Sequence, residues 1–144
     1  IRSLVVKSLR DRLTVAEQEL LELLINDTEL RSKVIPHLEE TDYESLATSS
    51  IFRALITLQQ SDSDVTFEHL MELTDDDALA KDLMPLLFMS EPSREADEAI
   101  DDVLVKAENC VATLRVMAIS RRIMEISQEL ALAEQAKNLD LLND

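Results

Sequence analysis

Residues 94–136 read READEAIDDVLVKAENCVATLRVMAISRRIMEISQELALAEQA, and this stretch decides the fold. It contains no proline, no glycine and no cluster of turn residues. Proline removes a helical hydrogen bond and glycine lowers helix propensity, so their absence allows one continuous helix. At 1.5 Å per residue this helix would be roughly 60 Å long, about twice the diameter of a small domain.

Apolar residues follow this predicted helix in two successive stripes. The first stripe predicts a face that packs on the rest of the chain, and it consists of Ile100, Val103, Leu104, Ala107, Val111 and Leu114. Beyond Arg115 the phase slips, and the second stripe consists of Ile119, Ile123, Ile126, Leu130 and Ala133. We expect this second half to project from the globule. Something must then cover its stripe, either the rest of the chain or another protein.

The last residues, 138–144, predict the start of a further helix. Asn138 is typical of a cap or turn residue, and Leu139, Leu141 and Leu142 follow it. These leucines would fold back on the projecting half as a helical hairpin. The chain ends at Asp144 before that helix is complete and opens on Ile1 rather than Met, so we expect a truncated hairpin and a fragment of a larger protein.

Residues 14–92 predict a compact bundle of short helices, with a linker or leading helix over 1–13 and the long helix over 93–137. Caps mark most boundaries: Thr14 and Glu17 have the spacing of a capping box, and Thr66 precedes the helical segment FEHLMEL. The acidic run at 75–77 suits a helix N-terminus. Pro36 shortens or bends the helix in which it occurs. Connections of a few residues between such helices indicate one all-α globule.

The composition excludes several classes of function. With 30 acidic against 14 basic residues, a net charge of -16 and no Lys/Arg-rich run, the chain is not expected to bind nucleic acid directly. Glycine is absent, so a phosphate-binding loop, a dinucleotide fingerprint or a nucleophile elbow cannot be built. The longest apolar run, LMPLLFM at 83–89, is far shorter than the ~20 residues that cross a bilayer. The lone Cys110 excludes an internal disulfide and suits the cytoplasm.

Two metal-site patterns also fail, so we expect neither a metal nor a cofactor. Residues 62–73 space oxygens like a calcium loop, but Phe67 stands where that loop requires glycine and Leu73 where it requires a glutamate. A di-iron bundle requires Glu three residues before His, and neither His37 nor His69 meets that requirement. For Cys110, inside a helix and far from any histidine in sequence, packing is favoured over nucleophilic catalysis.

Three segments suggest a family: AEQELLELLINDTEL at 16–30, SSIFRALITLQQ at 49–60 and CVATLRVMAISRRIMEISQELALAEQAKNLDLL at 110–142. Together they resemble the C-terminal, helicase-binding domain of bacterial replicative primase, the DnaG type, over about residues 13–144. The resemblance implies a helical bundle joined by a long helix to a C-terminal hairpin, which docks on the N-terminal domains of the replicative helicase hexamer. The zinc-binding and polymerase domains of that transferase would lie earlier, so this part would be non-catalytic. Glycine often follows the first hairpin helix in the family, whereas Lys137-Asn138 would make the turn here.

Two alternatives stay open. The bundle also resembles the N-terminal domain of the replicative helicase itself, although the long arginine-containing helix and the ending ELALAEQAKNLD stand where a helicase would need a linker to its motor. The second alternative is a self-associating oligomerisation domain whose exposed stripe pairs with its own copy.

The arginines beside the stripe have two interpretations. In the first interpretation these arginines form ion pairs within the chain. Their partners would be Glu125, Glu129 or carboxylates of the globule, and the arginines are Arg115, Arg121 and Arg122. Alternatively, they form the polar rim of a docking surface, because arginine is favoured at interfaces. We expect no catalytic residue, and the expected partner-binding residues are Arg121, Arg122, Ile123, Ile126, Leu130, Leu139 and Leu142.

Overall fold

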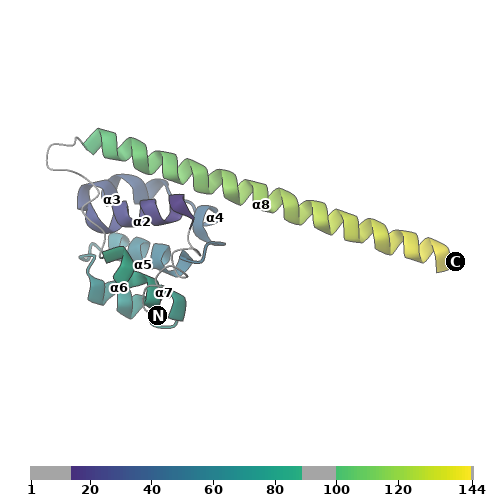
Figure 1. Ribbon diagram of the computed structural model, residues 1–144, viewed down its shortest axis with the longest axis horizontal. Coiled ribbons are helices and arrows are strands. Elements are labelled where there is room, and N and C mark those ends of the chain that lie inside the picture. Colours follow the sequence, from purple (N-terminus) through teal and green to yellow (C-terminus); the bar gives the residue numbers. More distant parts are fainter. Residues whose placement is uncertain (1–13, 89–99, 144) are drawn as a thin grey trace, which may run out of the picture.

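The computed structural model describes residues 14–88 and 100–143, and every regular element in these ranges is a helix (Figure 1). The predicted all-α class is therefore confirmed. The predicted segment 1–13 and residues 93–99 of the predicted long helix lie outside the described residues. The elements are α2 (Val15–Asn26), α3 (Thr28–Val34), the 3₁₀ helix η1 (Ile35–His37), α4 (Glu40–Tyr43), α5 (Ser49–Gln60), α6 (Phe67–Leu73), α7 (Ala78–Phe88) and α8 (Ile100–Asn143).

The first described helix, α2, begins with the predicted capping box. The Glu17 N–H donates to the Thr14 hydroxyl oxygen at 3.2 Å, and the Thr14 N–H donates to the Glu17 carboxylate at 3.3 Å. Glu17 is buried, and its second carboxylate oxygen accepts the Thr48 N–H at 3.1 Å and the Thr48 hydroxyl. Thr48 precedes α5, so one carboxylate both caps α2 and holds it against the start of α5.

The junction between α2 and α3 is closed by a buried arginine. Arg31 Nη1 donates to the carbonyl oxygens of Leu24 and Ile25, both at 2.9 Å. These carbonyls belong to the last turn of α2, where no intrahelical partner is available. The following helix is short, as predicted, because α3 ends at Val34 and Pro36 lies within η1.

The starts predicted for α6 and α7 are confirmed in the structure. The Thr66 hydroxyl accepts the His69 N–H at 3.1 Å at the start of α6. Asp77, the last residue of the acidic run, precedes α7 and accepts the Ala80 N–H at 3.2 Å. The Ser50 hydroxyl also donates to Asp77 at 2.6 Å, which joins the starts of α5 and α7.

The core of the bundle is aliphatic with two aromatic side chains. The rings of Tyr43 and Phe52 stack with their centroids 5.6 Å apart. Burying such side chains supplies most of the free energy that holds helices this short together. The largest fully buried side chains are Phe52, Leu20, Leu21, Leu24, Leu30, Ile51, Leu55, Leu70, Leu83, Met84, Leu87 and Leu114.

Helix α8 lies across α2, α3 and α4 and then extends far beyond the bundle (Figure 1). Its 44 residues make it roughly 66 Å long at 1.5 Å per residue. The predicted packing stripe is confirmed, because Val103, Ala107 and Leu114 are buried and Cys110 is buried between them. From Ser120 to Leu142 every side chain except that of Arg121 is exposed, so the predicted projection of the second half is confirmed as well.

The predicted hairpin turn is wrong. Helix α8 continues through Lys137 and Asn138 to Asn143 without a break. Asn in a helix interior costs only a few tenths of a kcal/mol more than most residues, and the leucines after it are good helix formers. No glycine is present to adopt the left-handed conformation that commonly ends a helix. The residues predicted as the start of a second hairpin helix therefore form the last turns of α8.

Candidate interaction surface on helix α8

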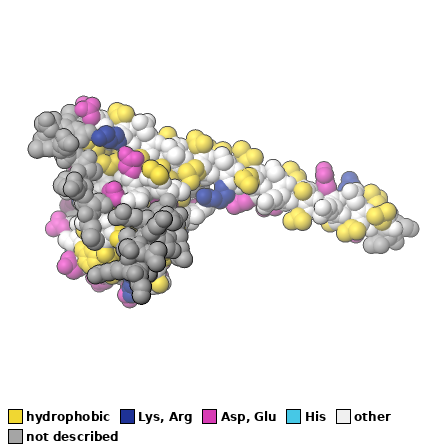
Figure 2. Space-filling model, in the orientation of Figure 1, with side chains coloured by type: hydrophobic (Ala, Val, Ile, Leu, Met, Phe, Trp, Pro, Cys, Tyr) yellow, Lys and Arg dark blue, Asp and Glu magenta, His cyan; other side chains and the backbone are white. Residues whose placement is uncertain are grey.

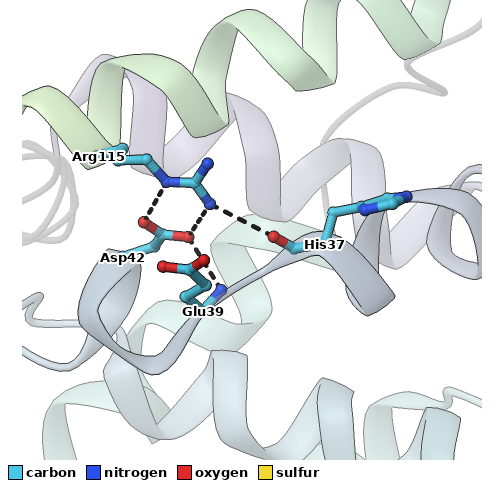
Figure 3. Close-up of polar contacts among 4 residues, drawn as sticks. All are labelled: His37, Glu39, Asp42 and Arg115. Carbon is cyan, nitrogen blue, oxygen red and sulfur yellow. Dashed lines mark hydrogen bonds and ion pairs between the residues drawn. The ribbon is translucent and has the colours of Figure 1, made fainter.

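The point where α8 leaves the bundle is fixed by an ion pair between Arg115 and Asp42 (Figure 3). Arg115 Nε donates to Asp42 Oδ1 at 2.9 Å, and Arg115 Nη2 donates to Asp42 Oδ2 at 2.7 Å. Arg115 Nη2 also donates to the His37 carbonyl oxygen at 3.3 Å. Such a two-pronged geometry fixes direction as well as distance, so it sets the angle at which α8 projects.

Asp42 is the buried partner in this ion pair, with 1 % of its side chain exposed against 42 % for Arg115. Burial alone would raise the pKa of the Asp42 carboxyl. The hydrogen bond from Arg115, the Glu39 N–H at 3.0 Å and the positive charge of Arg115 outweigh burial, and the pKa is lowered. Asp42 is therefore ionised at neutral pH and anchors α4 to α8.

A groove of about 390 Å³ lies beside this ion pair, between α4 and α8. Glu44 lines it from the bundle side, and Arg121, Arg122 and Ile119 line it from α8. Arg121 is half-buried there and makes no hydrogen bond or ion pair within the described part of the chain, whereas Arg122 is exposed. The two arginines predicted as the rim of a docking surface therefore lie at the base of the projecting half.

The structure distinguishes the roles of the three arginines. Arg115 pairs with a carboxylate of the bundle, as the first interpretation predicts. Arg122 pairs with Glu125 at 3.3 Å, but both side chains are at least half exposed, and an exposed pair of this kind adds little stability. Arg121 and Arg122 are thus available to contact another molecule at small cost.

Alongside the groove and beyond it, where it projects as an arm, α8 carries an apolar stripe on the side opposite its buried face. We call this the outer stripe: Val116, Ile119, Ile123, Ile126, Leu130 and Ala133. At about 100° per residue these positions lie roughly half a turn from the buried face at Val103 and Leu114. Their exposure is large, with 58 % of Ile123, 41 % of Ile126 and 62 % of Leu130 accessible. An exposed apolar row of this length is typical of an interaction site.

A second apolar row, which we call the inner stripe, lies on the opposite side of the arm: Met124, Ala131, Leu132, Leu139 and Leu142. Leu132 is 66 % exposed and Leu142 is 81 % exposed. Figure 2 shows hydrophobic side chains on both edges of the projecting arm. Because α8 does not turn at Asn138, Leu139 and Leu142 do not fold back on Ile126. The predicted contact set is therefore divided between two faces of one helix.

Sequence reasoning missed two parts of this surface. Nothing local to Asp42 indicates that a residue 73 positions later pairs with it. The inner stripe had a usable signal, because Met124, Ala131 and Leu139 recur at steps of seven and eight residues, two helical turns apart. A turn at Asn138 would place Leu139 on a different helix, so the expected turn hid this two-turn spacing.

The structure provides little for catalysis in the described residues. No three His, Cys, Asp or Glu side chains among them form a group that could hold a metal ion. Burial, with a smaller effect from Glu19, raises the pKa of the Cys110 thiol to about 11, so this thiol is not an activated nucleophile. His69 is exposed, and its ring contacts the Asp64 carbonyl oxygen at 2.8 Å. Within the same residues, no helix has both the length and the hydrophobicity to cross a membrane.

Comparisons with known proteins add no identification: no family model, no curated protein and no solved structure matches the chain. The resemblance to the primase domain therefore stays a prediction from the three segments quoted above.

Proposed function

We propose that this chain is a non-catalytic docking domain of a bacterial replicative primase. It binds the N-terminal domains of the replicative helicase hexamer in the cytoplasm and so couples priming to unwinding. The partner is the one that the resemblance implies. The observation that supports docking is the arm itself, which presents exposed isoleucine and leucine side chains well away from the bundle.

The ion pair at the base of the arm supports this proposal. A docking helix loses less conformational freedom on binding when it is already folded and aimed. Arg115 and Asp42 hold α8 to the bundle at the point where its buried face ends, since Leu114 is the last fully buried side chain of α8. The arm is then an extended, preformed element whose apolar side chains need no rearrangement before they meet a partner.

The test is a titration of the labelled chain against purified replicative helicase hexamer, with single-stranded DNA as a parallel ligand. The variant Ile126→Asp places a charge at the centre of the outer stripe and should abolish saturable binding. Asn138→Asp is the matched control, because it adds the same charge at an exposed position between the two stripes. Truncation by Ile126→Ala should weaken binding by about 2 kcal/mol. Binding to DNA alone, or binding that Ile126→Asp leaves intact, would contradict the proposal.

The inner stripe sharpens the same experiment. Leu132→Asp places a charge on the inner stripe, about a third of a turn around the helix from Ile126. If the helicase contacts only the outer stripe, Ile126→Asp will abolish binding and Leu132→Asp will resemble Asn138→Asp. If the arm inserts between two helicase domains, both substitutions will weaken binding by similar factors.

A further inference from the structure

The outer stripe has the spacing of a coiled-coil seam. Its six positions, from Val116 to Ala133, follow one another at alternating steps of three and four residues. This spacing keeps a narrow apolar seam on one side of a helix, where a second helix can pack with knobs in holes. The inner stripe lacks this regularity, since Gln128 and Gln135 interrupt it.

A second helix has room to lie along this seam. The outer stripe lies roughly half a turn around α8 from Val103, Ala107, Cys110 and Leu114, which pack on the bundle. The bundle of the same molecule therefore packs on the other side of α8, although Ile119 at the base of the seam also lines the groove beside α4. All six side chains of the stripe are exposed and can therefore be reached by a second helix.

The charges beside the seam distinguish the two possible directions of a partner helix. Arg122 and Glu129 flank one edge, and Ser120, Ser127 and Glu134 flank the other. In a parallel pair of identical helices each Glu129 would face Glu134 of the second copy, and this like-charge contact would occur twice. In an antiparallel pair Arg122 faces Glu129 of the second copy, and the two-fold symmetry forms this ion pair twice.

We propose that the outer stripe pairs with the outer stripe of a second copy of this chain as an antiparallel two-helix coiled coil. The two-fold axis passes between Met124 and Glu125. Ile123 then packs against Ile126 of the second copy, and Leu130 packs against Ile119 of the second copy. Ala133 meets Val116 at each end, so large side chains fill the centre and small ones close the ends. The two bundles lie at opposite ends of the paired arms, on their outer sides.

This inference is independent of the helicase proposal, because it concerns only the seam and its flanking charges. It has a consequence for that proposal, however. The paired form covers Ile123, Ile126 and Leu130, so a partner that needs the outer stripe must compete with the second copy. The inner stripe stays exposed in both forms.

The pairing should be weak. Its seam spans fewer than the three to four heptads that usually make a stable coiled coil, and each copy has a net charge of -16. The measurement is sedimentation equilibrium up to about 1 mM, where even ~4 kcal/mol of association free energy is detectable. We expect a monomer–dimer equilibrium that Ile126→Asp abolishes and Asn138→Asp leaves unchanged. A monomer throughout this range, or a dimer that Ile126→Asp does not affect, would overturn the proposal.

The direction of pairing is tested by reversing one charge. Glu129→Arg would set two arginines against each other in the antiparallel dimer and should raise its dissociation constant about tenfold. In a parallel dimer the same change would remove the contact between Glu129 and Glu134 and so strengthen association. Adding Arg122→Glu to Glu129→Arg should restore most of the original affinity, since the ion pairs reform with reversed sign. Tighter association of the Glu129→Arg variant would overturn the antiparallel arrangement.

Discussion

The two halves of α8 use the same kinds of side chain at the same helical spacing for different purposes. In the first half, Val103, Ala107 and Leu114 face the bundle and are completely buried or nearly so. In the second half, Ile123, Ile126 and Leu130 face away from it and stay exposed. The difference arises because α8 runs past the bundle near Arg115, since Leu132 and Leu139 keep the phase of the buried face and are exposed as well. Hydrophobic residues in one unbroken helix can therefore serve folding in one part and recognition in another.

The largest difference between the halves should appear when one leucine is truncated in each. Leu114→Ala removes a side chain that is 1 % exposed, so it should lower the free energy of unfolding by about 3 kcal/mol through lost burial and a cavity. Leu130→Ala removes a side chain that is 62 % exposed and should change the free energy of unfolding by less than about 0.5 kcal/mol. Urea denaturation followed by circular dichroism measures both. Equal losses would show that the arm is packed against something within the monomer.

The reactivity of a cysteine thiol should differ almost as strongly between the two halves of α8. The pKa of Cys110 is raised to about 11, so at pH 8 its thiolate population is more than ~100-fold below that of an ordinary thiol. A cysteine introduced as Ser127→Cys is exposed on the arm and provides the comparison in the same molecule. Mass spectrometry of maleimide adducts should find the arm modified first by a wide margin. Comparable rates at the two sites would mean that the first half of α8 detaches readily from the bundle.

The boundary between the halves depends on Asp42. Asp42→Asn removes the charge that Arg115 contacts and should destabilise the fold by about 2 kcal/mol, the usual value of a hydrogen bond to a charged group. Asp75→Asn is the matched control, because Asp75 pairs with Lys81 at 2.6 Å but is 78 % exposed. That control should unfold with the same midpoint as the wild type. If both variants behave alike, the Arg115–Asp42 pair contributes no more than a surface contact.

The contribution of Asp42 should also depend on pH, with a sign that follows from its lowered pKa. A carboxyl whose pKa is lower in the folded state stabilises the fold above its unfolded pKa of about 3.9, and this stabilisation disappears as the pH falls through the folded value. The difference in unfolding free energy between wild type and Asp42→Asn should therefore be constant from pH 5 to 7 and shrink below about pH 4. A difference that grew on acidification would contradict the ion pair.

Local signals in the sequence predicted most of this fold. The capping box at Thr14, the caps at Thr66 and Asp77, and the packing stripe of α8 all depend on neighbours within a few residues, and the structure confirms them. The pairing of Arg115 with Asp42 could not be predicted in this way, because which carboxylate lies beside α8 depends on how the whole bundle folds. The projection of the second half of α8 was predicted from its stripe. What binds that stripe could not be predicted, because the fold of a single chain does not depend on it.

The prediction of a turn at Asn138 was wrong for a different reason. A substitution at this position has the smallest expected effect among these comparisons of the two halves of α8. Asn138 favours turns and caps, but a preference of a few tenths of a kcal/mol cannot end a helix between good helix formers. Asn138→Ala should therefore stabilise the last turns of α8 by about 0.5 kcal/mol, seen as slower amide exchange over residues 134–142. If Asn138 capped a second helix, the same substitution would cost about 1 kcal/mol and speed exchange. The sign of this change decides whether the arm ends as one helix, with its two stripes on opposite faces.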